Sequence, residues 1–128
     1  MHILAVAIGG ALGASARYLV TGLPGFAGQR FPWGILIVNL VGCFLIGLVM
    51  QHTTTRVGGD DTLRIFVVVG FLGALTTFST FGYDTLMLMR AGEMGLAALN
   101  VLANVVLGIG LVALGWQVGK WWLGSAGA

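Results

Sequence analysis

Four long apolar runs, at about residues 3–21, 34–50, 63–89 and 95–118, alternate with short polar stretches in this chain. About 20 apolar residues are enough to cross the hydrocarbon core of a bilayer as an α-helix. Because 58% of the 128 residues are hydrophobic and only 8% are charged, the chain lacks the polar side chains that a water-exposed surface needs. We therefore expect an all-α membrane protein, with one four-helix domain over residues 1–128, and we expect the first run to remain as a span instead of being removed as a signal peptide.

The charged and metal-binding residues exclude several other classes. A formal charge of +2 with scattered basic residues argues against a nucleic-acid partner. A single cysteine, Cys43, excludes an intrachain disulfide and supplies no set of metal ligands. We find no cluster of His, Cys or carboxylate residues at membrane depth and no phosphate-binding glycine loop in the sequence. The sequence therefore predicts neither an enzyme nor an ATP-driven pump.

The third apolar run contains an unusual density of residues that disfavour a continuous helix. Between positions 70 and 82 lie three glycines and four Ser or Thr residues: Gly70, Gly73, Gly82, Thr76, Thr77, Ser79 and Thr80. Glycine weakens helices, and Ser and Thr side chains offer the backbone alternative hydrogen bonds. In hydrocarbon, non-helical backbone persists only where it is buried in protein or lines a polar cavity. We therefore predict that the third span is broken at its centre, beside an ion or substrate site.

The length of this run agrees with a break. Residues 63–89 are 27 residues, which would form a straight helix of about 40 Å, whereas the hydrocarbon core is about 30 Å thick. Tilt or local unwinding can absorb the excess, and the Gly and Thr content favours unwinding.

Polar residues at membrane depth occur in the other spans as well. Asn39 serves either only as an interhelical hydrogen-bonding residue or as part of a functional site. Asn100 and Asn104 are four residues apart and are predicted to share a helix face. Arg17 either extends to the membrane interface or lines an anion vestibule. Two pairs of small residues, Gly9 with Gly13 and Gly115 with Gly119, predict close helix packing.

These polar groups leave two kinds of ligand open. Amides and hydroxyls donate hydrogen bonds without holding a net charge, and Phe78 and Phe81, three residues apart, can present the positive edges of their rings. Such a set suits a small anion. Unwound backbone carbonyls suit a small cation instead. Asp84 shares the face of the two rings and either pairs with Arg17 or another basic residue, or is solvated.

Several segments of the chain resemble the Fluc (CrcB) family of fluoride channels. The most specific is Gly-Ala-Leu-Thr-Thr-Phe-Ser-Thr-Phe at residues 73–81. The others are Arg17-Tyr18 at the end of a glycine-rich first span, Val-Asn-Leu-Val-Gly at 38–42, and the Asn100-xxx-Asn104 pair. The resemblance extends over the whole chain. It implies a fluoride-selective channel of the bacterial inner membrane that lets fluoride leave passively and so lowers cytoplasmic fluoride.

The same resemblance implies an assembly and a set of roles. Members of the family are antiparallel homodimers in the lipid bilayer with two pores, each built from both subunits. The implied anion pathway uses eight residues: Asn39 as donor, Phe78 and Phe81 through their ring edges, Ser79 and Thr80 through their hydroxyls, and Asn104, Asn100 and Arg17 along its course. The backbone carbonyls of Gly73 and Thr76 from both subunits would hold a structural sodium ion. Gly108 stands where a further hydroxyl is expected on the fourth helix.

Two rival functions remain from the sequence alone. Proton-coupled exporters of cationic compounds, such as the small multidrug-resistance transporters, are also short four-span proteins, but they need a carboxylate deep in the first span, and this first span has none. A subunit that only packs against other proteins would explain the glycines but not the hydroxyl run together with Asn100 and Asn104.

The distribution of Lys and Arg between the two membrane faces is nearly even. Orientation follows this bias and not the net charge. Three basic residues are expected on the side of the N-terminus, and up to three on the other: Arg56, Arg64 and Lys120, against Arg30, Arg90 and Arg17. We therefore expect insertion in both orientations, which would supply the two halves of an antiparallel dimer.

Overall fold

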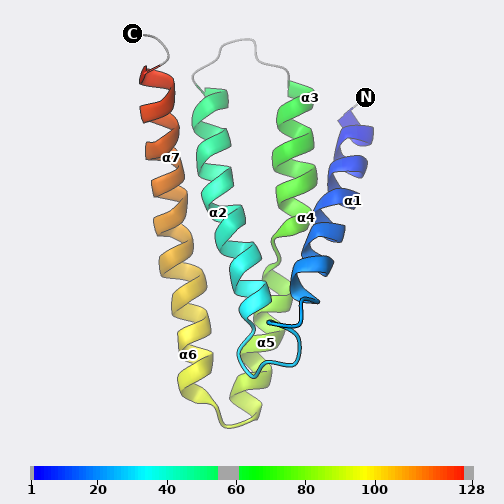
Figure 1. The fold of residues 1–128 in the computed structure, drawn as a ribbon, viewed down its shortest axis with the longest axis vertical. Helices are drawn as coiled ribbons and strands as arrows, with labels where there is room; N and C mark the ends of the chain where they lie inside the picture. Colours follow the sequence, from blue (N-terminus) through cyan, green and yellow to red (C-terminus); the bar gives the residue numbers. More distant parts are fainter. Residues whose placement is uncertain (1, 55–60, 126–128) are drawn as a thin grey trace.

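The computed structural model describes residues 2–54 and 61–125, and all regular structure within these ranges is helical (Figure 1). The elements in chain order are α1 (His2–Thr21), α2 (Trp33–Thr54), α3 (Asp61–Arg64), η1 (Ile65–Leu72), α4 (Gly73–Leu75), α5 (Phe78–Arg90), α6 (Met94–Leu102), η2 (Ala103–Leu107) and α7 (Gly108–Ser125). The two η elements are stretches of π-helix, in which the helix is wider than an α-helix.

Within the described residues, four helical segments are long and apolar enough to cross a membrane, as the sequence predicts. They cover His2–Thr21, Trp33–Gln51, Thr62–Arg90 and Met94–Trp122. Fewer than a third of the residues in each span are buried within the chain. The apolar side chains therefore face outward in large numbers, as they do in a protein surrounded by lipid. The chain is a multi-pass membrane protein.

Two of the helices continue beyond their predicted ends. The second helix does not end near residue 50 but continues to Thr54, and the last continues past residue 118 to Ser125. Loss of apolar character ends a span, but a helix ends only where a breaking residue or a cap stops it. No glycine or proline occurs between 48 and 57, and α7 continues through Gly119. The rest of the predicted polar loop, residues 55–60 with Arg56, lies outside the described residues.

The helices run side by side along the long axis of the molecule (Figure 1). α1 packs against η1 and α4, while α2 packs against α7 along most of its length. The start of α1, the end of α2 and the end of α7 lie at the same end of the molecule, as an even number of crossings requires. α5 and α6 pack against each other at the opposite end.

Close glycine contacts explain the two main helix pairings. A Cβ atom on Gly13 would overlap the carbonyl oxygen of Phe71 in η1, and Gly9 lies equally close to the same element. A Cβ atom on Gly115 would overlap the carbonyl oxygen of Phe44 in α2, and the second glycine of that pair also contacts α2. The two glycine pairs predicted from the sequence are therefore confirmed as close-packing sites.

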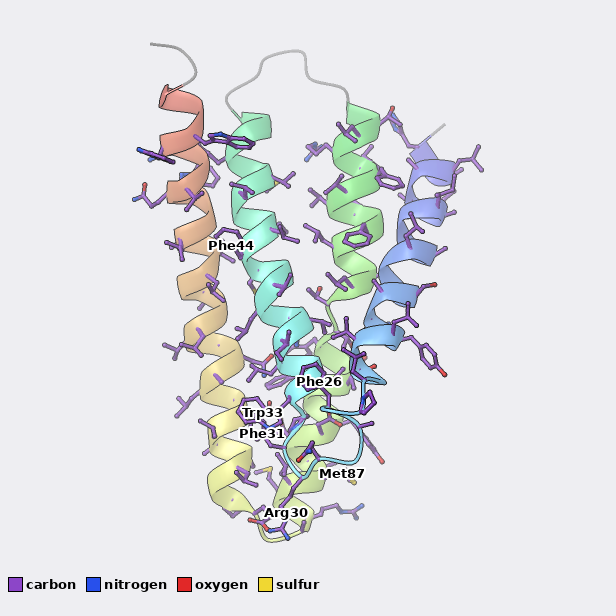
Figure 2. All side chains as sticks on the ribbon, in the orientation of Figure 1. Phe26, Arg30, Phe31, Trp33, Phe44 and Met87 are labelled. Carbon is purple, nitrogen blue, oxygen red and sulfur yellow. The ribbon has the colours of Figure 1, made fainter. Side chains whose placement is uncertain are left out.

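The segment between α1 and α2 lies beside α5, near the end of the molecule where α5 and α6 meet (Figure 2). Phe31 is buried, and its ring centroid lies 4.7 Å from that of Trp33. Arg30 Nη1 lies 2.7 Å from Glu93 Oε1, so an ion pair joins this segment to the turn between α5 and α6. The pair is largely exposed, so it fixes the two loops with little net stabilisation.

Candidate functional site

Two residues in the third span have extended backbone conformation. Thr76 has φ −82° and ψ 154°, and Thr77 has φ −150° and ψ 121°, between the end of α4 and the start of α5. Their hydroxyls satisfy neighbouring backbone groups. Thr76 Oγ1 donates to the carbonyl of Leu72 (3.0 Å), and Thr77 Oγ1 accepts from the N–H of Thr80 (3.3 Å), which caps the start of α5. We refer to Thr76 and Thr77 as the extended pair.

Asn39 on α2 replaces the helical hydrogen bonds that Thr77 lacks. The N–H of Thr77 donates to Asn39 Oδ1 (2.9 Å), and Asn39 Nδ2 donates to the carbonyl of Thr77 (3.3 Å). The side-chain amide thus pairs with the peptide group of Thr77 much as a neighbouring strand would. Because an unsatisfied backbone group in a bilayer costs several kcal/mol, this amide stabilises the extended pair at membrane depth.

A chain of hydrogen bonds leads from Asn39 to the fourth span and back to α5. Asn39 Nδ2 donates to Asn104 Oδ1 (2.9 Å), and Asn104 Nδ2 donates to Asn100 Oδ1 (3.1 Å) and to its carbonyl (2.9 Å). Asn100 Nδ2 donates to Thr85 Oγ1 (2.9 Å), which donates to the carbonyl of Phe81 (2.7 Å). We call this set of side chains the amide chain. It confirms that Asn100 and Asn104 share a face, and it joins three separate helical segments.

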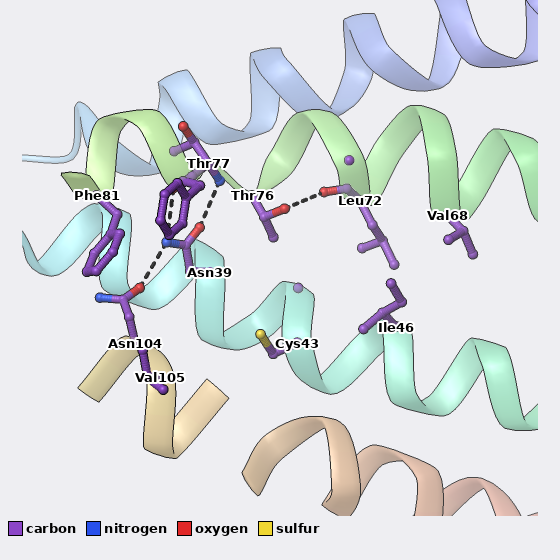
Figure 3. A pocket seen from close by; sticks show the side chains of 13 residues that line it. Asn39, Cys43, Ile46, Val68, Leu72, Thr76, Thr77, Phe81, Asn104 and Val105 are labelled. Carbon is purple, nitrogen blue, oxygen red and sulfur yellow. Dashed lines mark hydrogen bonds between the residues drawn. The ribbon is translucent and has the colours of Figure 1, made fainter. Parts of the chain in front are cut away.

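A cavity of about 350 Å³ lies beside the extended pair (Figure 3). Its walls come from α2, from the third span and from η2, and its 13 lining residues include no charged side chain: Asn39, Gly42, Cys43, Ile46, Val68, Leu72, Gly73, Thr76, Thr77, Phe78, Phe81, Asn104 and Val105. Polar amide and hydroxyl groups gather at one end of it, and aliphatic side chains line the other (Figure 3). A neutral cavity of this kind can hold a small desolvated ligand near hydrogen-bond donors.

Two aromatic rings form part of the cavity wall. The ring centroids of Phe78 and Phe81 lie 5.4 Å apart with an interplanar angle of 52°, so the two rings share a face as predicted. Phe81 is buried, at 9% exposure, whereas Phe78 is 83% exposed. The cavity is therefore open to the outside of the chain at Phe78.

Four of the residues singled out from the sequence lie beside the cavity but not in its lining. The Oγ atoms of Ser79 and Thr80 each lie 3.2 Å from Thr77 Oγ1. Asn100 is completely buried behind the lining residues. Arg17 donates from Nη1 to the carbonyl of Thr76 (3.4 Å), so its guanidinium points to the extended pair. Each of them contacts a lining residue or its backbone.

Of the three alternatives for Asp84, the pairing with Arg17 is not formed among the described residues, where Arg17 donates to the carbonyl of Thr76. Asp84 instead lines a second cavity, of about 370 Å³, next to the loops at the α5–α6 end. Arg30 and Glu93 line the same cavity and pair with each other. Asp84 lies one turn of α5 from Phe81, so the two cavities occupy successive positions along the same helix.

The carbonyl of Gly73 lacks the partner that a continuing helix would give it. In such a helix the N–H of Thr77 would donate to Gly73, but here it donates to Asn39 Oδ1. Gly73 lies near the C-terminal end of the first helical part of the third span, where the helix dipole is negative. A freed carbonyl in this position fits a small cation. The carbonyl of Thr76 already accepts from Arg17, which leaves it one lone pair.

Sequence reasoning missed two residues and the local role of a third. Thr85 joins Asn100 to Phe81, and the only signal for it is its position four residues after Phe81, where a hydroxyl can reach back to a carbonyl. Cys43, which the sequence analysis considers only for disulfides and metal ligands, lines the cavity, and a Cβ on Gly108 would lie 3.4 Å from its sulfur. Thr77 was singled out only as one of a run of hydroxyls, although it is the cap of α5.

Comparison with known proteins identifies the family. The family model described as "CrcB-like protein, Camphor Resistance (CrcB)" matches residues 4–116. A protein of Geobacter sulfurreducens named fluoride-specific ion channel FluC is 50% identical over 106 residues, which are 82% of this chain and 86% of the relative. Proteins of the same name from Geobacter metallireducens and Magnetococcus marinus are 49% and 46% identical, over 90% and 94% of this chain and 94% and 98% of their own length. The chain, with its cavity beside the extended pair, therefore belongs to the family of CrcB-like proteins.

Proposed function

We propose that this protein is a fluoride channel, through which fluoride crosses the bacterial inner membrane passively and leaves the cytoplasm. The relatives that carry the name fluoride-specific ion channel match nearly the whole chain at 46–50% identity. The match includes all four spans, since the family model covers residues 4–116. On this proposal the protein moves an ion and performs no chemical reaction.

The observation that carries the proposal is the chemistry of the cavity beside the extended pair. Its polar side chains are amides and hydroxyls, it has two aromatic rings, and none of its lining residues is charged. Fluoride is small and a strong hydrogen-bond acceptor, so N–H and O–H donors and positive ring edges can replace part of its hydration. We assign Asn39, Asn104, Phe78 and Phe81 to direct contact with the anion. Ser79, Thr80, Asn100 and Arg17 complete the pathway next to them.

The rival function, a proton-coupled exporter of cationic compounds, requires a carboxylate that binds a proton and the substrate in turn. The cavity has no carboxylate among its lining residues, and Asp84 lines a separate cavity near the loops. A subunit that only packs against other proteins would need neither the extended pair nor the amide chain. We therefore favour passive anion conduction over both alternatives.

We infer that the working unit is an antiparallel homodimer with two pores. Phe78 lines the cavity and yet is 83% exposed, so a second copy placed against this face would complete the wall. The nearly even distribution of Lys and Arg between the two sides supports insertion in both orientations. An antiparallel two-fold axis next to the extended pair would bring together two copies of it.

A structural sodium ion on this axis is part of the proposal. The carbonyl of Gly73, which lacks its helical donor, and the remaining lone pair of Thr76 would supply two ligands from each subunit. The ion would contribute a fixed positive charge between the two anion pathways, which stabilises anions near it.

Fluoride efflux from liposomes that contain only this protein tests whether it is a passive fluoride channel. We expect efflux without ATP and without an imposed proton gradient, provided that a potassium ionophore balances the charge. Efflux that requires a proton gradient would contradict a channel and favour a coupled transporter. Transport of a cationic compound instead of fluoride would favour the exporter.

A further inference from the structure

The hydrogen bonds of the amide chain all point in one direction. Asn39 donates to Asn104, Asn104 to Asn100, Asn100 to Thr85, and Thr85 to the carbonyl of Phe81. Each amide accepts through its oxygen and donates through its nitrogen to the next member. Hydrogen bonds aligned in this way polarise one another, so the orientation of one amide fixes the orientation of the next.

In this orientation no amide donor is free between Asn39 and Asn104. Asn39 has two N–H donors, and both are engaged, one by the carbonyl of Thr77 and one by Asn104 Oδ1. Between Asn39 and Asn104, an incoming anion would meet the Asn104 oxygen, which carries partial negative charge and repels it. Both donors of Asn104 point away from Asn39, to Asn100.

We propose that Thr85 is a positioning residue that allows the amide chain to reverse when fluoride binds between Asn39 and Asn104. In the reversed chain the Thr85 hydroxyl donates to Asn100 Oδ1, and Asn100 Nδ2 donates to Asn104 Oδ1. Asn104 Nδ2 then faces Asn39 Nδ2, and the anion accepts from both. This inference rests on the proposed function, because fluoride supplies the acceptor that the reversed chain requires.

The geometry makes the reversal possible with few lost contacts. The amide groups of Asn104 and Asn100 rotate about their terminal bonds, since the nitrogen and oxygen of an amide occupy equivalent positions. The side chains of Asn39 and Asn104, whose facing atoms are 2.9 Å apart, also separate to admit the anion. Three bonds are lost: the one from Asn39 to Asn104 Oδ1, which the anion replaces, and those to the carbonyls of Asn100 and Phe81. The reversed Asn104 oxygen must also move away from the carbonyl of Asn100, 2.9 Å from the present position of the nitrogen. Both carbonyls lie in helical segments and can keep backbone donors. Asn100 is completely buried, so bulk solvent does not reach it to take the place of Thr85.

A hydroxyl is the group that this position requires. It accepts from Asn100 in the first orientation and donates to Asn100 in the second. Valine has the same branched shape but can do neither. Serine can do both, so Thr85→Ser and Thr85→Val separate the hydrogen-bonding role from the packing role.

The first test measures fluoride efflux as a function of fluoride concentration for Thr85→Val, Thr85→Ser and a matched control, Thr21→Val. Thr21 Oγ1 also donates to a carbonyl four residues earlier, that of Arg17 (2.9 Å), but lies outside the amide chain. We expect Thr85→Val to raise the half-saturating fluoride concentration by about tenfold, because a buried amide loses its partner. Thr85→Ser and Thr21→Val should keep the value of the parent protein. A Thr85→Val variant with the half-saturating concentration of the parent, whatever its maximal flux, overturns the proposal.

The second test uses the unaltered protein and does not depend on a variant that folds. The chain contains three asparagines, Asn39, Asn100 and Asn104, so ¹⁵N-asparagine labelling reports on the amide chain alone. We expect sodium fluoride to shift all three side-chain amide signals in an NMR titration, and sodium chloride to shift none.

The two outcomes that count against the proposal differ from each other. If fluoride shifts the signals of Asn39 and Asn104 but leaves that of Asn100 in place, the anion binds without reversal, and the proposed function stands while this inference fails. If fluoride shifts no signal and the parent protein also passes no fluoride, the proposed function fails and the inference fails with it.

Discussion

At the scale of single residues, neutral groups provide the polar character of the site. Asn39 pairs with the peptide group of Thr77, and the rings of Phe78 and Phe81 lie against the same cavity. Neutral donors attract an anion without holding it as tightly as a fixed positive charge would. Rapid passage of the ion requires this combination of favourable entry and easy release.

The first prediction at this scale concerns the positive ring edge of Phe81. Isoleucine fills much of the same volume but has no positive edge. We expect Phe81→Ile to reduce fluoride flux by about tenfold, the effect of losing one favourable ring contact. The control is Phe31→Ile, because Phe31 is equally buried at 6% exposure but lies in a separate core cluster with Leu36 and Ala103. Equal flux in the two variants would mean that Phe81 contributes packing only.

Replacement of Asn39 by aspartate is the second residue-scale prediction. The carboxylate would place negative oxygen next to the carbonyl of Thr77 and to Asn104 Oδ1, where the amide nitrogen now donates. We expect Asn39→Asp to lose fluoride flux and also to unfold at lower temperature in detergent. Thermal unfolding followed by circular dichroism checks the second effect. A variant that conducts like the parent protein would contradict the assignment of Asn39 as a donor.

At the scale of elements, the close pairing of α1 with η1 holds the extended pair in place. Gly13 lies against Phe71, five residues before Thr76, and Arg17, one turn later, donates to the carbonyl of Thr76. The helix pairing therefore positions both the backbone of Thr76 and the guanidinium of Arg17 beside the cavity. A change in the distance between α1 and η1 should affect the site as well as the stability.

Alanine substitutions at two neighbouring glycines test this pairing. A Cβ at Gly13 would overlap backbone, whereas a Cβ at Gly10 would have nothing within 4 Å. We expect Gly13→Ala to destabilise the protein by about 1–3 kcal/mol. Gly10→Ala should be neutral or stabilise it by up to about 1 kcal/mol, because alanine favours the helix. Detergent-solubilised protein unfolded by heat or denaturant measures both, and equal effects would contradict the packing.

The sequence predicts some of these elements well and others poorly, for physical reasons. Hydropathy depends on local composition, so the four spans could be predicted, and the density of glycines and hydroxyls directed attention to the segment that contains Thr76 and Thr77. The helix ends could not be predicted, since α2 and α7 continue into polar residues.

Contacts between residues far apart in the sequence also could not be predicted from it. The bond from Asn100 to Thr85 and the bond from Arg17 to Thr76 depend on how the helices pack in three dimensions. In the absence of packing information, Arg17 was given Asp84 as a possible partner on grounds of charge alone. The family resemblance gave roles to six of the 13 lining residues, but none to Cys43, and it gave none to Thr85, which lies outside the lining.

At the scale of the whole molecule, the proposed antiparallel dimer makes a prediction about orientation. Two lysines added at the N-terminus and one in the segment 53–59 should hold that side in the cytoplasm in every copy. We expect this variant to lose flux when expressed alone and to regain it when expressed with a variant biased in the opposite direction. Accessibility labelling verifies the orientation. Full conduction by a variant with a single orientation would contradict the antiparallel model.

The most direct measurement of the central claim compares fluoride with chloride in one preparation. Liposomes that contain the purified protein are loaded with both ions, and each efflux is followed with its own electrode after a potassium ionophore is added. The cavity of neutral donors and ring edges beside the extended pair predicts rapid fluoride efflux while chloride stays inside. Chloride efflux at the rate of fluoride, or no fluoride efflux above that of protein-free liposomes, would contradict a fluoride-selective channel.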